Sequence, residues 1–244
     1  MNIFTAIGQF FTSWGAKLAS TFLEDDRYMM LVEGLGNTAV ITLGALCIGV
    51  VIGALVAIIK YCGEGVPALK PLCTLCDIYT TVIRGIPVVV VLLLFYFAFM
   101  QSANGITVGI VTFGINSGAY MAELMRSGIG AVDAGQLEAG RSLGMSRLQT
   151  TVHVILPQAM KNILPAIGNE MIINIKDSSV LNCIGVVELM YAATSVAGIY
   201  YKNLPNYVSA AIIYLIMTCC ISALLNKLSA RLSLNTYRGI PSSN

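Results

Sequence analysis

Long stretches without a charged residue alternate with short polar segments along this chain. Residues 38–59 form one such stretch, rich in Val, Ile, Leu, Ala and Gly. It is long enough to cross a hydrocarbon core of about 30 Å at about 1.5 Å per residue. Residues 85–122 also lack charge but are too long for one crossing, and the polar segment 101–105 supplies a turn. We therefore predict two spans joined by a hairpin there, and a further span over the charge-free residues 203–226.

Another apolar stretch, residues 163–187, is interrupted by the polar segment 176–179. We interpret it as one span broken by polar residues at membrane depth. The crossings then number five, and an odd number places the two chain ends on opposite sides of the membrane. An ionisable group at that depth is costly and usually faces a cavity or a partner. The candidates to line a path for a zwitterion are Asn169, Glu170, Lys176, Asp177, Ser178, Ser179 and Glu188.

A purely structural role is the alternative for the ionisable residues of this span. A Lys176–Asp177 or Glu170–Lys176 pair would let the span bend without touching a substrate. We favour that alternative for Lys176 and Asp177, and we leave both roles open for Glu170 and Glu188.

The segment 133–157 is too polar to span a bilayer and too regular for a slack loop. Gly144 lies between two candidate helices, where a left-handed residue would end the first. Two pairs have the spacing of a helix-capping box, namely Asp133 with Gln136 and Ser146 with Gln149. We predict a helix–turn–helix in water between the third and fourth spans, and we call this segment, residues 133–157, the elbow.

Basic residues determine the orientation. With the elbow in the cytoplasm, ten of the 14 Lys and Arg residues lie in cytoplasmic segments and three lie outside. Because basic residues concentrate in cytoplasmic loops, we predict an external N-terminus and a cytoplasmic tail over residues 233–244. Apolar residues at near-helical spacing within residues 1–28 predict an amphipathic helix in the outer interface.

Two further features indicate packing and anchoring. For Arg84 we favour the role of a positively charged anchor at the cytoplasmic start of its span, and a substrate ligand is the alternative. Patterns such as Gly49-x-x-x-Gly53 and Gly114-x-x-x-Gly118 allow helices to approach closely. The sequence leaves open whether these helices pack within this chain or between subunits.

The composition supports an all-α integral membrane protein with five transmembrane helices. Hydrophobic residues make up 57% of the chain and charged residues 11%, against roughly 25% charged in soluble domains. The net charge of +2 is too small to suggest nucleic-acid binding. The seven cysteines do not form a disulfide framework, and Cys73-x-x-Cys76 lacks the second ligand pair of a metal site. The chain also lacks a GxxxxGK[ST] phosphate-binding sequence, so we expect ATP to be hydrolysed elsewhere.

An ordered set of motifs resembles the membrane permease subunit of type I ATP-binding-cassette importers, in the branch that imports polar amino acids. The family's EAA signature, its following Gly and its I-x-LP stand here as Glu138-Ala139-Gly140, Gly144 and Ile155-Leu156-Pro157. Flanking motifs extend the resemblance over about residues 30–232, which implies a transmembrane domain over 29–232. Four positions depart from the family pattern: Gly140 replaces Ala, Ile86 replaces Thr, Val91 replaces Gln, and Ser178 replaces Thr.

The resemblance implies that the elbow is the coupling region that docks into a partner ATPase. The residues it would use are Leu137, Glu138, Ala139, Gly140, Leu143 and Gly144. Glu138 would make a charge-assisted contact, unless it is only a solvated helix charge. The implied partners are two ATPase subunits, a second permease subunit (identical or different) and an extracytoplasmic amino-acid-binding protein. The chain would be a non-catalytic, multi-pass protein of the bacterial inner membrane that binds no cofactor, and ATP and Mg would be held by the ATPase.

Other protein classes fit less well. A self-sufficient secondary transporter or channel is the main alternative, but such transporters are commonly built from paired repeats and this chain shows none. An intramembrane protease would need a histidine near a serine in the spans, and His153 lies in the elbow. A DNA-binding helix-turn-helix would not be tethered to a membrane at both ends.

Overall fold

The computed structural model describes residues 28–200 and 203–237, together with the isolated residues Thr12 and Gly15. The predicted interfacial helix over residues 1–28 and the end of the predicted tail therefore lie almost wholly outside the described residues. The main helices are α2 Tyr28–Gly63, α3 Lys70–Gly85, α4 Val88–Leu94, α5 Gly105–Gly130, α6 Gly135–Ser142, α7 Arg147–Thr150, α8 Leu156–Asp177, α9 Leu189–Tyr200 and α10 Asn203–Tyr237. Short 3-10 segments cover Pro67–Leu69 and Ser178–Ile184, and π-helical segments cover Phe95–Phe99 and Thr151–Ile155.

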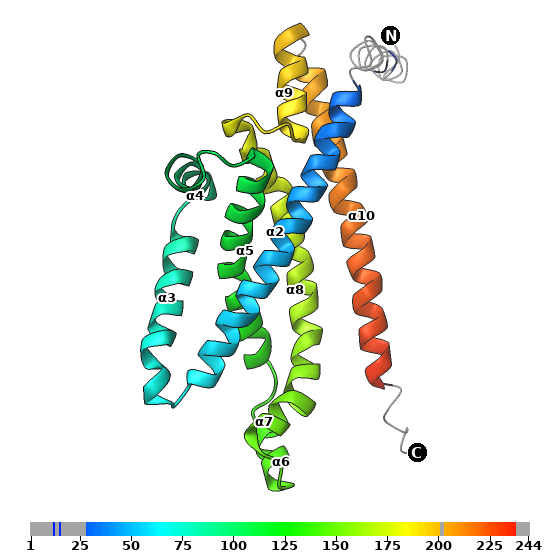
Figure 1. The fold of residues 1–244 in the computed structure, drawn as a ribbon. Helices are drawn as coiled ribbons and strands as arrows, with labels where there is room; N and C mark the ends of the chain where they lie inside the picture. The colour runs from blue at the N-terminus through cyan, green and yellow to red at the C-terminus, as the bar shows by residue number, and fades with distance from the viewer. Residues whose placement is uncertain (1–11, 13–14, 16–27, 201–202, 238–244) are drawn as a thin grey trace.

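The fold is an elongated helical bundle (Figure 1). Within the described residues, three helices are long and apolar enough to cross a membrane alone: Tyr28–Gly63, Gly105–Gly130 and Leu204–Lys227. Two bent pairs, Pro67–Gly85 with Val88–Phe99 and Arg147–Ile184 with Leu189–Ile199, raise the number to five if each counts as one span. The described helices can thus supply the five predicted spans, two of them bent.

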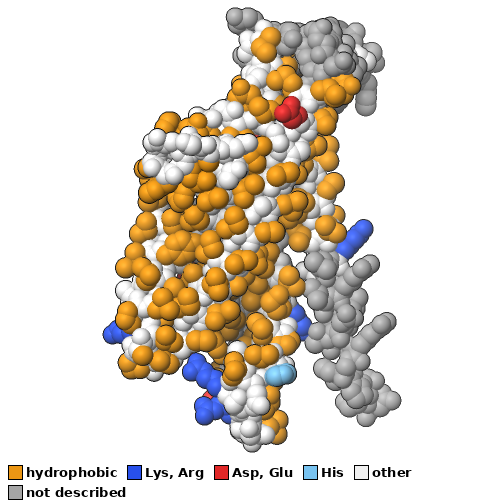
Figure 2. Space-filling view, in the orientation of Figure 1, with side chains coloured by type: hydrophobic (Ala, Val, Ile, Leu, Met, Phe, Trp, Pro, Cys, Tyr) orange, Lys and Arg blue, Asp and Glu red, His pale blue; other side chains and the backbone are white. Residues whose placement is uncertain are grey.

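The surface agrees with this arrangement (Figure 2). Hydrophobic side chains cover most of the side that is visible, and most of the Lys and Arg side chains on it lie toward the end that carries α6 and α7. The start of α2 and the end of α10 lie at opposite ends of the bundle (Figure 1), as an odd number of crossings requires.

Close packing of α2 against α5 forms the centre of the bundle. A Cβ atom added at Gly49 would lie 2.8 Å from Ser117 Cβ, and one added at Gly114 would lie 2.7 Å from Ile48 Cβ. Real Cβ atoms do not approach this closely, so the glycines are what allow the two helices to touch. The small-residue patterns therefore serve packing within the subunit, which the sequence left open.

The predicted second span differs from the observed one. Its helix begins at Lys70, not near Gly85, and bends by 107° between α3 and α4. Ile86 is extended, with φ −103° and ψ 133°, because a residue that precedes proline is disfavoured in the α conformation. The first part of this span, α3, contains charged residues, so it does not stand out in the sequence as a charge-free stretch. The predicted hairpin after it is confirmed, since α5 begins at Gly105 after a short non-helical segment.

The predicted interruption of the fourth span is confirmed. After α8 the chain passes through a 3-10 segment to Gly185, whose φ is +75°, and α9 follows at a bend of 48°. Two residues of α2 hold this break in place. Asn37 donates to the carbonyl oxygen of Val187 at 2.7 Å, and the hydroxyl oxygen of Thr38 accepts from the backbone N–H of Leu189 at 3.3 Å.

Candidate functional site

A cavity of about 470 Å³ lies where the bend of the second span faces α5 and α8. Its polar lining comes from three elements that are far apart in the sequence. The residues are Arg84 from the end of α3, Asn116 and Tyr120 from α5, and Glu170 and Asp177 from α8. The bend itself, residues 85–88, closes one side.

Arg84 is the cationic group of this cavity. Its guanidinium carbon lies 5.3 Å from the centre of the Tyr120 ring, which is the geometry of a cation–π contact. In the described part of the chain no carboxylate lies within 4.0 Å of the Arg84 guanidinium. Its N–H donors therefore remain available to an anion in the cavity. Arg84 therefore lies at the end of α3, beside the bend, and not at the start of the span as predicted.

Glu170 is the most deeply placed charge in the cavity wall, with only 4% of its surface exposed. Its Oε1 accepts a hydrogen bond from the hydroxyl of Ser117 at 2.8 Å, and that hydroxyl accepts one from Asn174 Nδ2 at 2.7 Å. These two bonds fix the orientation of the carboxylate. Asp177 lies two helical turns further along α8 and also lines the cavity. The cavity therefore presents two carboxylates and one guanidinium.

The structural pairings weighed for Lys176 are not observed. Within the described residues no ion pair of 4.0 Å or less joins Lys176 to Asp177 or to Glu170. Lys176 is exposed, while Asp177 is half-buried against the cavity. The bend of this span is produced by the 3-10 segment and Gly185 instead, so Asp177 is left free to face the cavity.

The remaining candidates of the interrupted span lie elsewhere. Asn169 is on the exposed face of α8. The hydroxyls of Ser178 and Ser179 donate to backbone carbonyls one turn earlier, each at 2.7 Å. Glu188 is fully buried at the start of α9. Its carboxylate accepts from the backbone N–H groups of Met190 and Tyr191 at 2.8 and 2.6 Å.

Glu188 also accepts a hydrogen bond from the hydroxyl of Tyr214 on α10 at 2.9 Å. Three donors therefore surround this carboxylate, two of them orphan amides of a helix N-terminus. This arrangement caps α9 and ties it to α10, and it brings Glu188 to none of the cavity residues.

The sequence analysis did not name Asn116 or Tyr120 as cavity residues, and it favoured an anchoring role for Arg84 and a structural role for Asp177. The available signal was the arginine immediately before Gly85-x-Pro87. When a proline breaks a helix within the membrane, the charged residue before it lies at membrane depth. A charge at that depth needs a cavity or a partner.

The elbow forms a second candidate site at the end of the bundle (Figure 1). Gly144 has a φ of +83°, and it ends α6 as predicted. The N–H of Met145 donates to the carbonyl oxygen of Gly140 at 3.1 Å, and that of Gly144 donates to the carbonyl oxygen of Arg141 at 3.0 Å. These are the two hydrogen bonds of a Schellman motif.

Only one of the two predicted capping boxes is present. Ser146 and Gln149 exchange both hydrogen bonds of the motif, at 3.2 and 2.8 Å. Asp133 instead accepts from the N–H of Gly135 at 2.6 Å, and α6 begins with Ala134 as its N-cap. Because the Asp133 carboxylate accepts from the N–H of Gly135, it does not accept from the N–H of Gln136, as a capping box would require.

Pro157 does not end the elbow. α7 continues through the π-helical segment Thr151–Ile155 into α8, and Pro157 lies in the first turn of α8. The π-helical segment before it changes the hydrogen-bond pattern, since the N–H of Leu156 donates to the carbonyl oxygen of Thr151, five residues earlier. The second helix of the elbow is thus continuous with the interrupted span.

The coupling candidates divide into exposed and enclosed residues. Leu143 is 84% exposed, and Leu148, which was not among the candidates, is 71% exposed, although both are apolar. Glu138, Ala139 and Gly144 are exposed and Leu137 is half-buried. Gly140 is buried instead, and a Cβ added there would lie 2.8 Å from Thr150 Oγ1. This contact is a physical reason for glycine at that position.

The sequence profile of one protein family, described as the inner membrane component of binding-protein-dependent transport systems, matches residues 68–234. The glutamine transport system permease protein GlnP of Escherichia coli (strain K12) is 36% identical to the chain over 210 residues. That alignment covers 84% of the chain and 94% of GlnP.

Two solved structures are similar in fold. A crystal structure of an amino acid ABC transporter with histidines superposes with a TM-score of 0.79 at 40% identity, over 86% of this chain and 98% of that chain. The inward facing MetNI methionine ABC transporter gives a TM-score of 0.76 at 19% identity, over 86% of this chain and 99% of that chain. At that identity the second likeness concerns the fold alone.

Proposed function

Since this chain belongs to the family of inner membrane components of binding-protein-dependent transport systems, we propose that it forms the translocation pathway for a polar amino acid. The observation that carries the proposal is the cavity at the bend of the second span. It combines one guanidinium without an ion-pair partner among the described residues with two carboxylates.

The charges of the cavity are complementary to a free amino acid. Arg84 is suited to bind the α-carboxylate, because a guanidinium forms paired hydrogen bonds with planar oxyanions. Glu170 and Asp177 are suited to bind the ammonium group. The volume of about 470 Å³ lies within the roughly 300–1,000 Å³ of small-molecule pockets.

The names of the relatives support an amino acid as the substrate, but they do not identify which amino acid. GlnP is a permease for glutamine, and the 40%-identical transporter was solved with histidines. These amino acids share a carboxylate and an ammonium group but differ in their side chains. We propose that Arg84, Glu170 and Asp177 recognise the shared groups.

We propose that the elbow transmits conformational changes of a partner ATPase to this cavity. Leu143 and Leu148 expose apolar surface that a partner would cover, and Glu138 provides a charged contact beside them. The Schellman motif, the capping box and the continuous path into α8 make the elbow a stiff element. A stiff element moves as a rigid body and can tilt the span to which it is joined.

The proposed assembly contains two ATPase subunits, a second permease subunit and an extracytoplasmic amino-acid-binding protein. ATP and Mg would be bound by the ATPases, and this chain would contribute no catalytic residue. ATP-driven closure of the ATPases would draw two elbows together and open the pathway outward to the docked binding protein. ATP hydrolysis would return it to the inward state.

The test is stimulation of ATP hydrolysis in nanodiscs that contain the chain with its ATPase and binding protein. A panel of amino acids should identify at least one that raises the rate. Arg84→Gln and Glu170→Gln should each weaken the response to that amino acid by about tenfold or more, because each removes a charge-assisted contact worth about 1.5–3 kcal/mol. Asn162→Ala, on the exposed face of the same α8 helix, is the matched control. Equal responses in all three variants would refute the assignment of the cavity.

A further inference from the structure

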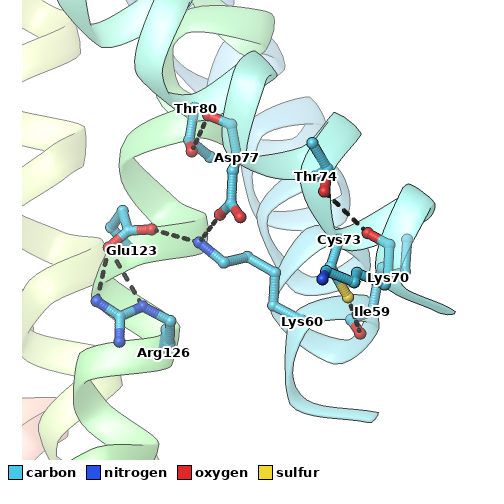
Figure 3. A network of polar contacts seen from close by, with 9 residues as sticks. All are labelled: Ile59, Lys60, Lys70, Cys73, Thr74, Asp77, Thr80, Glu123 and Arg126. Carbon is cyan, nitrogen blue, oxygen red and sulfur yellow. Dashed lines mark hydrogen bonds and ion pairs between the residues drawn. The ribbon is translucent and has the colours of Figure 1, made fainter. Parts of the chain in front are cut away.

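Four charged residues join three helices at the end of the bundle that carries the elbow (Figure 3). Lys60 of α2 contacts Asp77 of α3 at 2.8 Å and Glu123 of α5 at 3.0 Å. Arg126 of α5 contacts the second oxygen of Glu123 at 3.0 Å. We call these four residues the Lys60 cluster. Lys60 alone connects α2, α3 and α5, because the Arg126–Glu123 pair lies within one helix.

The same turn of α2 also contacts the elbow. The hydroxyl of Tyr61 lies 2.8 Å from that of Thr151, and the guanidinium of Arg147 lies 5.5 Å from the centre of the Tyr61 ring. Arg147 also contacts Glu64 at 3.7 Å. Lys60 and Tyr61 are adjacent in the chain. A displacement of the elbow that moves Tyr61 would therefore be transmitted to Lys60 through the peptide bond between them.

α3 is the most weakly embedded of the helices around Lys60. Only Cys76 and Thr80 are buried along its length, and apolar residues such as Leu75 and Ile78 are exposed. A cavity of about 400 Å³ lies between this helix and its neighbours, lined in part by Lys60, Asp77 and Arg126. The Tyr79 hydroxyl of α3 donates to the carbonyl oxygen of Ile115 on α5 at 2.6 Å. The space beside the Lys60 end would let α3 tilt about this contact.

The opposite end of α3 carries Arg84. The helix is hinged there by the 107° bend that leads into α4, and Arg84 lines the cavity proposed for the amino acid. A tilt of α3 at the Lys60 cluster would therefore move Arg84 relative to Glu170 on α8.

We propose that Lys60 is a positioning residue that transmits movement of the elbow to α3 and thereby sets the place of Arg84 in the cavity. The proposal rests on the function proposed above for that cavity. Lys60 acts through Asp77 and touches no substrate.

The chemistry of Lys60 suits this role. An ammonium group has three donors and can hold two carboxylates at once. The Lys60 side chain is only 17% exposed, so its contacts are screened less than those of a surface pair. Asp77 is 58% exposed, so its loss should release the end of α3 without disturbing a buried core.

The first experiment measures the coupling of amino-acid transport to ATP hydrolysis in the full complex. Lys60→Met, which keeps the apolar stem, and Asp77→Asn should each lower the transport per ATP by about fivefold, a modest coupling effect. Asp77→Glu, which retains the charge, should restore it. Arg126→Gln is the matched control, since this exposed residue pairs only within α5. Unchanged coupling in Lys60→Met and Asp77→Asn would overturn the proposal while leaving the function of the cavity intact.

The second experiment does not depend on transport. Spin labels at Thr74 on α3 and Leu148 on the elbow, both exposed, report the distance between the two elements in nanodiscs. Bioorthogonal attachment is required, because the chain has seven cysteines. The distance distribution should be narrow in the unmodified chain and in Arg126→Gln, and broad in Lys60→Met and Asp77→Asn. A distribution that stays narrow in Lys60→Met would overturn the proposal even if no amino acid stimulated the ATPase.

Discussion

Replacing Gly53 by alanine adds a methyl group where α2 and α5 are already in contact. The new Cβ atom would lie 3.0 Å from the backbone nitrogen of Ala122, and closer still to Met121 Cβ. Backbone atoms of a packed helix cannot rotate aside, so the two helices must separate. Gly36 lies on the same helix and has nothing within 4 Å of its added Cβ. Gly36→Ala is therefore the matched control.

The expected difference follows from two opposing effects. Replacing a helical glycine by alanine favours the helix by about 0.8–1.0 kcal/mol, and this gain is common to both variants. Overpacking costs about 1–3 kcal/mol, and this cost arises only at Gly53. Subtracting one variant from the other leaves the overpacking cost alone. For a protein of this size about 2 kcal/mol corresponds to about 4–8 °C in the unfolding midpoint.

The assay is thermal unfolding of both variants and the unmodified chain in one detergent. Gly36→Ala should unfold at or slightly above the midpoint of the unmodified chain, and Gly53→Ala should unfold about 4–8 °C below Gly36→Ala. Equal midpoints for the two alanine variants would refute the conclusion that these glycines serve contact between α2 and α5.

Three further predictions concern the elbow and the interrupted span. Glu138→Arg should uncouple amino-acid-stimulated ATPase while membrane insertion stays normal, and normal coupling would argue against docking through that residue. Ser146→Ala should lower the free energy of unfolding by about 1 kcal/mol, because it removes an N-cap; an unchanged value in denaturant titrations would show that the box does not stabilise the elbow. Glu188→Gln should lower the thermal midpoint, since its carboxylate accepts three hydrogen bonds, but should leave amino-acid selectivity unchanged. A changed selectivity would return Glu188 to the substrate pathway.

Much of the fold follows from local chemistry that the sequence displays. Charge-free stretches identify α2, α5 and α10, because crossing a bilayer excludes charge over about 20 residues. Gly144 and the Ser146–Gln149 pair identify the elbow, because a left-handed residue and a capping box act within one turn of chain.

The cavity could not be predicted in the same way, because it depends on three-dimensional arrangement. Arg84 and Glu170 are 86 positions apart (170 − 84), and only the packing of α3, α5 and α8 in the folded chain places both in the wall of one cavity. The sequence correctly indicated that Glu170 needs a partner or cavity, but it did not distinguish Glu170 from Glu188. That distinction comes from the backbone amides of Met190 and Tyr191, which surround Glu188 only once α9 has formed.

Uptake of a labelled amino acid into proteoliposomes tests the central claim most directly. The chain would be reconstituted with its ATPase and binding protein, and in parallel by itself. Uptake is expected only when the ATPase, the binding protein and ATP are all present, and it should decrease strongly when Glu170 is replaced by glutamine. Uptake by the chain alone, at a rate that ATP and the ATPase do not change, would contradict that claim and identify a self-sufficient transporter or channel.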